Sequence, residues 1–181
     1  MTIKITLDVN DYLTYHLYLA SKSDSLKKRR LIHWFIIPIV YVIAGYAFVY
    51  LNGAEMIKTI FLATALIWFL IYPFYSKWAI RRFLTRQIIK RYENLIDKEG
   101  SLKLDDKKIT VKSHDASMDF DYKDIKDIIE LSNHFLIDLK VASSLILPKH
   151  KIPDEILAKV IDKIIDKTGL TPKIQTLWGW K

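Results

Sequence analysis

The sequence predicts an α+β membrane protein, in which a two-helix transmembrane hairpin precedes a cytoplasmic antiparallel β domain with a C-terminal helix. Three observations support this fold class. Apolar residues are concentrated between positions 31 and 80 of the 181, and basic residues crowd the two outer ends of that segment. After position 100, apolar and polar side chains alternate in short runs, as they do in half-buried strands.

Within the segment 31–80, the hairpin has two candidate spans, residues 31–51 and 57–75, joined by an outer loop at 52–56. The first span contains no charged residue. At about 1.5 Å per residue, a helix of this length covers the roughly 30 Å hydrocarbon core. The second span carries only Lys58 near its start, where a long side chain can reach the head groups. Two unbroken apolar helices of this length would otherwise need a large soluble domain around them.

Basic residues at both outer ends of the hairpin predict its orientation, because positively charged flanks stay in the cytoplasm. We therefore expect a multi-pass membrane protein with both termini cytoplasmic. The same residues are the expected lipid head-group flank, and they are Lys27, Lys28, Arg29, Arg30, Lys77, Arg81, Arg82 and Arg86. Since the net charge of +8 is concentrated in these flanks, membrane lipid is the expected partner and nucleic acid is not.

Residues 1–30 are expected to form a cytoplasmic strand and helix. Ile3, Ile5 and Leu7 alternate with polar residues, and Asp8 can cap the helix that follows. We expect the strand to join the sheet formed after position 100, because its apolar face would otherwise be exposed.

The chain after the second span is expected to contain a juxtamembrane helix at 81–100 and a β domain with its closing helix at 101–170. Gly100 should end the first helix, and Pro153 and Gly169 should bound the second. Between them, six alternating runs predict six short strands. With the N-terminal strand, this makes seven strands and a C-terminal helix, the inventory of a pleckstrin-homology-like barrel.

The remaining residues, 171–181, are expected to form a short tail. Trp178 and Trp180 are the expected interface residues of this tail, because exposed indoles usually find an interface or a groove. They would either insert at the lipid head groups or pack back onto the β domain. Pro38 and Pro73 lie inside the predicted spans, and we expect the bends they cause to serve helix packing.

The sequence contains no strong motif for a catalytic or metal-binding site. The chain has no cysteine, which excludes thiol nucleophiles and cysteine-ligated metals. The best acidic cluster is Asp119, Asp121 and Asp124, but these residues would lie on the solvated face of a strand with lysines nearby. The histidines outside the predicted hairpin and its N-terminal helix are expected in turns or just before the last helix, without metal-ligand spacing, and they are His114, His134 and His150. We therefore expect no catalytic, cofactor-binding or metal-binding residues, and no enzyme.

An aromatic residue, two spaced aliphatic residues and an aliphatic–aliphatic–Pro–Lys strand end occur in this order in the β domain. They are Tyr122, Ile125, Ile128, Ile146, Leu147, Pro148 and Lys149. This order of parts resembles the YcxB-like family of small bacterial membrane proteins, which usually has Trp where this chain has Tyr122. The resemblance covers most of the chain and implies an inner-membrane protein with a pleckstrin-homology-like cytoplasmic domain. It brings no activity, substrate or catalytic residue with it.

Three classes of function fit these features. The leading hypothesis is a non-catalytic membrane-anchored interaction module that binds a protein or a lipid head group at the cytoplasmic face. The alternative is a membrane immunity or stress protein that neutralises a toxin. The third is a subunit of a transport or channel complex, which two helices without mid-membrane charge could form only by oligomerising. A protein partner and a homo-oligomer therefore both stay open.

Overall fold

The computed structural model describes residues 1–53, 55–113, 117–140 and 144–180. The chain forms two compact units. One unit, here called the β unit, contains residues 1–16 and 85–179. The other, here called the helical unit, contains residues 17–84 and the end of the chain. Each unit is described by itself below.

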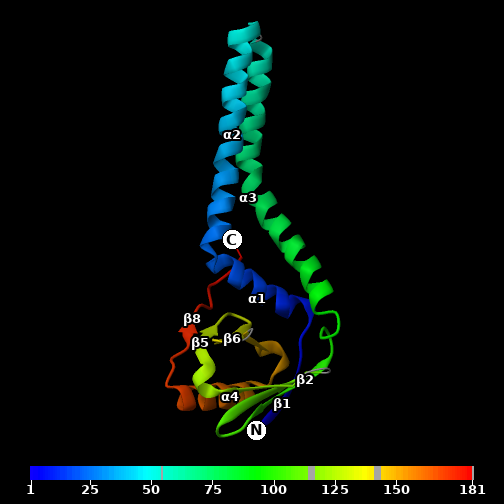
Figure 1. Ribbon diagram of the computed structural model, residues 1–181, viewed down its shortest axis with the longest axis vertical. Coiled ribbons are helices and arrows are strands. Elements are labelled where there is room, and N and C mark those ends of the chain that lie inside the picture. Colours follow the sequence, from blue (N-terminus) through cyan, green and yellow to red (C-terminus); the bar gives the residue numbers. More distant parts are fainter. Residues whose placement is uncertain (54, 114–116, 141–143, 181) are drawn as a thin grey trace. The chain divides into compact units, whose positions relative to one another are not determined.

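Two long helices, α2 (Asp24–Asn52) and α3 (Glu55–Arg91), lie side by side in the helical unit (Figure 1). The Ser23 side chain caps α2 by accepting a hydrogen bond from the Leu26 N–H. Gly53 ends α2 in the left-handed conformation, at a φ of 62°, which a glycine adopts without strain. Both helices are long and apolar enough to cross a membrane, by length and composition.

The apolar side chains of both helices face outward. In the most apolar window of each helix, only 6% is buried. The expected spans 31–51 and 57–75 lie within these helices, and the link between the helices falls in the expected loop.

The proline of α3, Pro73, is accommodated by an indole hydrogen bond from α2. Pro73 has no N–H to donate to the carbonyl of Phe69, four residues earlier, and the Trp34 Nε1–H donates to that oxygen instead, at 2.8 Å. Trp34 also stacks on the Phe69 ring, with 5.1 Å between ring centres. The Trp34 indole therefore contributes to the packing of α2 against α3 near Pro73, and the role expected for the proline bends stays a prediction.

The first sheet of the β unit joins the N-terminal strand to three later strands. Its order is β1 (Thr2–Thr6), β2 (Glu99–Leu104), β3 (Lys108–Lys112) and β4 (Ser117–Asp121), all antiparallel. Strand β1 pairs with β2 so that Ile3 lies opposite Leu102, and both side chains are buried. The expectation that the N-terminal strand joins the later sheet is confirmed.

The second sheet has the order β7-β6-β5-β8. Strands β5 (Ile125–Glu130), β6 (His134–Leu139) and β7 (Leu145–Pro148) are antiparallel, and the short β8 (Lys173–Ile174) runs parallel to β5. Strand β8 was not predicted, because two residues carry no alternation.

Helix α4 (Asp154–Thr168) follows the second sheet's antiparallel strands (Figure 1). Pro153 and Gly169 bound it as predicted. Its buried face, Leu157, Val160, Ile161 and Ile164, belongs to the same apolar core as residues of both sheets. This buried apolar face is therefore the side of α4 that closes the β unit.

The structure corrects one predicted helix end and the predicted place of His134. Helix α3 ends at Arg91 and not at Gly100, because Glu99 and Gly100 pair with β1 and a sheet ladder replaces the helical hydrogen bonds. Strand β4 ends at Asp121, since residues 122–124 form a 3₁₀ turn with a capping box. His134 is the first residue of β6 and does not lie in a turn.

Candidate functional site

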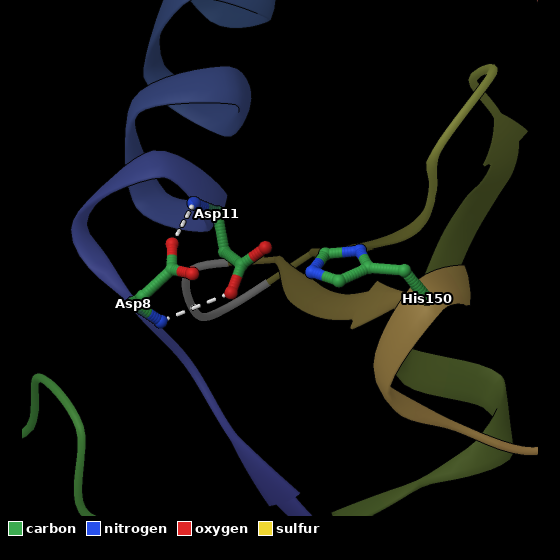
Figure 2. Close-up of side chains that lie close together, drawn as sticks. All are labelled: Asp8, Asp11 and His150. Carbon is green, nitrogen blue, oxygen red and sulfur yellow. Dashed lines mark hydrogen bonds between the residues drawn. The ribbon is translucent and has the colours of Figure 1, made fainter.

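A pair of carboxylates lies at the first turn of α1 (Val9–Lys22), in the part of that helix that belongs to the β unit. The Asp11 N–H donates to Asp8 Oδ1 at 3.0 Å, and the Asp8 N–H donates to Asp11 Oδ2 at 2.9 Å (Figure 2). This reciprocal pair is a capping box, in which each side chain satisfies a backbone N–H that the helix leaves unpaired. Its local role fixes where both carboxylates lie.

Two basic side chains from the far end of the sequence meet these carboxylates. Lys151 Nζ lies 2.8 Å from Asp8 Oδ2 and 2.6 Å from Asp11 Oδ2. His134 Nε2 lies 2.8 Å from Asp11 Oδ1, so this nitrogen donates to the carboxylate. The four residues are here called the Asp11 cluster. They tie the start of α1 to strand β6 and to the segment before α4.

Burial and hydrogen bonding act in opposite directions on the Asp11 cluster. Asp11 is only 1% exposed. Burial by itself would raise the pKa of Asp11, but hydrogen bonds from His134 and Lys151 outweigh it and lower the pKa to about 2. For Lys151, burial would lower the pKa, whereas its bonds to the two carboxylates raise it. Asp11 and Lys151 are therefore both ionised near neutral pH.

The two carboxylates and a nearby histidine are also a candidate site for a metal ion. Asp8, Asp11 and His150 each offer a ligand atom, and these atoms lie within 4.8 Å of one another (Figure 2). However, the ammonium group of Lys151 bridges the two carboxylates, which is where a shared cation would bind. The arrangement is that of an internal ion pair, and the expectation of no metal-binding residue stays a prediction.

An apolar groove of about 280 Å³ opens in the β unit. One wall is the inner face of the first sheet, with Ile5, Leu102, Val111 and Met118, and the other is strand β7 at residues 145–147. Cross-strand pairing aligns Leu102, Val111 and Met118 on one face. Met118 is 60% exposed, so the apolar face extends beyond the part that the core covers.

The charged groups that line this groove in the described part of the chain are Lys98 and Lys112, without an acidic residue. Sequence analysis did not find the groove. The only signal was that the alternation continues to Met118 at an edge strand, and this pattern does not reveal whether another element covers it.

A smaller cavity of about 220 Å³ lies between α2 and α3, within the helical unit. Its walls include Lys27, Arg30 and Trp34 from α2, and Tyr72 and Ser76 from α3. It is here called the basic pocket. Two members of the expected lipid flank, Lys27 and Arg30, thus line a cavity.

The tail places its last tryptophan against the helical unit. Trp180 Nε1–H donates to the Lys77 carbonyl at 3.4 Å, and the Arg30 guanidinium lies 5.5 Å from the Trp180 ring centre. This contact of Trp180 is with the helices and not with the β domain, so the two outcomes expected for the tail stay predictions. Trp178 is half-buried.

The other members of the expected lipid flank lie on the surface of α2 and α3, apart from Lys77, which is half-buried. Exposed side chains belong to Lys28, Arg29, Arg81, Arg82 and Arg86. The Arg82 guanidinium lies 5.0 Å from the ring centre of Trp78. Contact of these residues with lipid stays a prediction.

The acidic residues at and just after β4 form ion pairs with lysines or accept a backbone hydrogen bond. Asp119 pairs with Lys108 at 2.6 Å, and Asp121 pairs with Lys123 at 2.9 Å. Asp124 accepts a hydrogen bond from the Asp121 N–H. These contacts agree with a solvated face. The predicted turn at His114 lies outside the described residues.

Comparison with known proteins identifies part of the β unit. The family model described as YcxB-like protein matches residues 104–165, from the end of β2 into α4. No curated protein and no solved structure matches the chain. The matched segment contains the residues from Tyr122 to Lys149 on which the resemblance rested. The chain therefore contains a YcxB-like domain at residues 104–165.

Proposed function

We propose that the protein is a non-catalytic, membrane-anchored interaction module. Helices α2 and α3 span the inner membrane, the link between them lies outside, and the β unit binds a protein or a lipid head group at the cytoplasmic face. The observation that carries this proposal is the outward-facing apolar surface of α2 and α3.

That surface is costly in water. Ile43 is 63% exposed and Leu66 60% exposed, and many other large apolar side chains of α2 and α3 are similarly exposed. Removing one Leu or Ile side chain from water is worth about 1.5–3 kcal/mol. A bilayer supplies such an environment for both helices, and the basic residues at their outer ends favour the cytoplasmic leaflet.

The β unit is, in this proposal, a pleckstrin-homology-like domain. Support comes from seven strands in two antiparallel groups followed by the closing helix α4. The short parallel strand β8 is an addition to that inventory.

Binding rather than catalysis is supported by the lining of the apolar groove. Its described walls contain aliphatic, serine and lysine side chains together with Tyr12 and Met118, without the His, Asp or Glu that most often transfer protons in enzymes. An apolar groove with two lysines suits a partner that carries aliphatic groups and negative charge.

The experiment that tests the proposal is a cysteine accessibility assay, since the chain has no cysteine of its own. Met56, at the start of α3, is 80% exposed, and Ser132 is exposed in the β unit. In intact cells, an impermeant thiol reagent should label Met56→Cys and leave Ser132→Cys unlabelled. Met56 is preferable to Gly53, whose positive φ would strain a cysteine.

Permeabilised cells serve as the control, because both variants should then be labelled. Labelling of Ser132→Cys in intact cells would contradict the proposed topology. Release of the whole chain by alkaline carbonate would contradict membrane insertion itself.

A further inference from the structure

The inner face of the first sheet changes from apolar to charged along the apolar groove. Cross-strand pairing places Leu102, Val111 and Met118 in one row on this face. Residues two positions apart share a face of a strand, so Gly100 and then Lys98 follow Leu102 on the same side. Lys98 thus lies roughly 13 Å along the strand from Leu102. The groove is therefore aliphatic at one end and has an ammonium group at the other.

The charged end of the groove lies where β1 leads into α1. The Asp97 N–H donates to the Leu7 carbonyl at 2.9 Å, which extends the pairing of β1 with β2 and places Leu7 beside Lys98. Tyr12, from the start of α1, also lines the groove. Burial is the main cause that raises the pKa of Tyr12 to about 12, so its hydroxyl keeps its proton and can donate a hydrogen bond.

The second lysine of the groove belongs to the opposite face of the sheet. Lys112 follows Val111 directly in β3, so their side chains lie on different sides. On the outer side, the pKa of Asp119 is lowered first by its hydrogen bond with Lys108 and also by the charge of Lys112. Among the described residues, no acidic side chain forms an ion pair with Lys98. Lys98 is therefore the lysine whose charge is directed to the inner face.

The size and lining of the groove favour one aliphatic chain with a negatively charged end. Its volume of about 280 Å³ lies at the lower limit of the roughly 300–1,000 Å³ typical of small-molecule sites, which suits one chain better than the two chains of a phospholipid. A peptide would bring an N–H and a C=O at each residue to the apolar walls, whereas an aliphatic chain brings no such group. A carboxylate is complementary to the ammonium group of Lys98 and the hydroxyl of Tyr12.

We propose that the apolar groove of the β unit binds one fatty acid, with its chain against Leu102, Val111 and strand β7 and its carboxylate at Lys98 and Tyr12. This inference rests on the proposed role of the β unit as a binding module, and it deepens that role by naming the ligand. It does not require that α2 and α3 span a membrane.

The chain offers a matched control for testing the carboxylate contact. Lys98 and Lys112 are both exposed residues that line the groove, and Lys98→Gln and Lys112→Gln each remove one positive charge. Since the two side chains lie on different faces of the sheet, any difference between the variants reports position rather than net charge. Laurate and dodecanol are the matched ligands, because they share one chain length and differ in the charged end.

The measurement is photocrosslinking of the full chain in phosphatidylcholine liposomes, with a fatty acid that carries a diazirine at the end of its chain, followed by peptide mass mapping. Labelling should be saturable, should fall on β2, β3 or β7, and should be competed by laurate better than by dodecanol. Lys98→Gln should raise the laurate concentration for half-maximal competition roughly threefold or more, and Lys112→Gln less than about twofold. Limited proteolysis checks that both variants keep the fold of the β unit.

Three results would overturn the proposal. Labelling confined to α2 and α3 would mean that the fatty acid is only dissolved in the bilayer. Equal competition by laurate and dodecanol, or equal effects of the two lysine substitutions, would contradict the carboxylate contact. Competition by an acidic apolar peptide but not by laurate would assign the groove to a protein partner, and the binding role of the β unit would then stand without the fatty acid.

Discussion

At the scale of single residues, Asp11 has more stabilising contacts than its place at a helix start requires. Its carboxylate accepts hydrogen bonds from the Asp8 N–H, His134 Nε2 and Lys151 Nζ, and it is almost fully buried. A buried charge is tolerated only when partners compensate for lost hydration. Removing the Asp11 charge would therefore leave Lys151 without part of its compensation.

The lowered pKa of Asp11 predicts how stability depends on pH. Its ordinary value is 3.8 and its folded value is about 2. A group with a lowered folded pKa stabilises the protein above its ordinary value, and this contribution is lost as pH falls through the folded value. The shift corresponds to about 2 kcal/mol. Urea unfolding of the full chain in detergent, followed by near-UV circular dichroism, should show stability falling between about pH 4 and pH 2.

Asp11→Asn is the matched variant for this prediction. It should be less stable than the unmodified chain near neutral pH, and it should lose less stability between about pH 4 and pH 2. An identical decline in both proteins would show that other carboxylates govern acid unfolding.

The Asp11 cluster also shows why the sequence did not reveal this site. Asp11 and His134 are 123 positions apart, and Lys151 is 140 positions from Asp11. Local spacing reports only partners within a few residues, and it correctly indicated that Asp8 caps a helix. The long-range partners come from helix α1, strand β6 of the second sheet and the segment before α4, and they meet through the packing of the β unit, which no short motif encodes.

At the scale of elements, composition and the period of the apolar residues were sufficient to locate the helices and strands. Uniform apolar content located α2 and α3, and alternation located strands β1 to β7. A predicted boundary was wrong where a helix and a strand competed for the same residues. The helical pattern continues past Arg91, but Glu99 pairs with Thr6 of β1, a contact that depends on a segment more than 90 positions away.

Gly45 gives a test of helix packing in the helical unit. A Cβ at this position would lie 3.0 Å from Phe61 Cβ on α3, so glycine permits the close approach of the two helices. Gly45→Leu should destabilise the helix pair by about 1–3 kcal/mol through overpacking. The shift of the midpoint in an SDS unfolding titration, followed by circular dichroism, measures this effect.

Ala47 supplies the control for Gly45, because it is exposed on the same helix two positions later. Ala47→Leu should leave the midpoint nearly unchanged. Equal shifts for the two substitutions would mean that the effect comes from added bulk in α2 and not from contact with α3.

At the scale of the whole molecule, the chain order interleaves the two units. Strand β1 is separated from its partner β2 by α2 and α3, yet the β unit contains both strands. The YcxB-like match begins at residue 104, after β1 and nearly all of β2. The matched segment therefore lacks part of the first sheet that the complete β unit contains.

This interleaving predicts that the N-terminal strand is required for a stable β unit. Without β1, the edge of β2 and the side chain of Leu102 would lose their partners. Ile3→Asp places a charge at a buried position opposite Leu102, and it should make the β unit sensitive to limited proteolysis in detergent. Thr2→Asp adds the same charge at an exposed position and should preserve protease resistance. If Ile3→Asp leaves the proteolytic pattern of the β unit unchanged, residues 99–179 fold without the N-terminal strand.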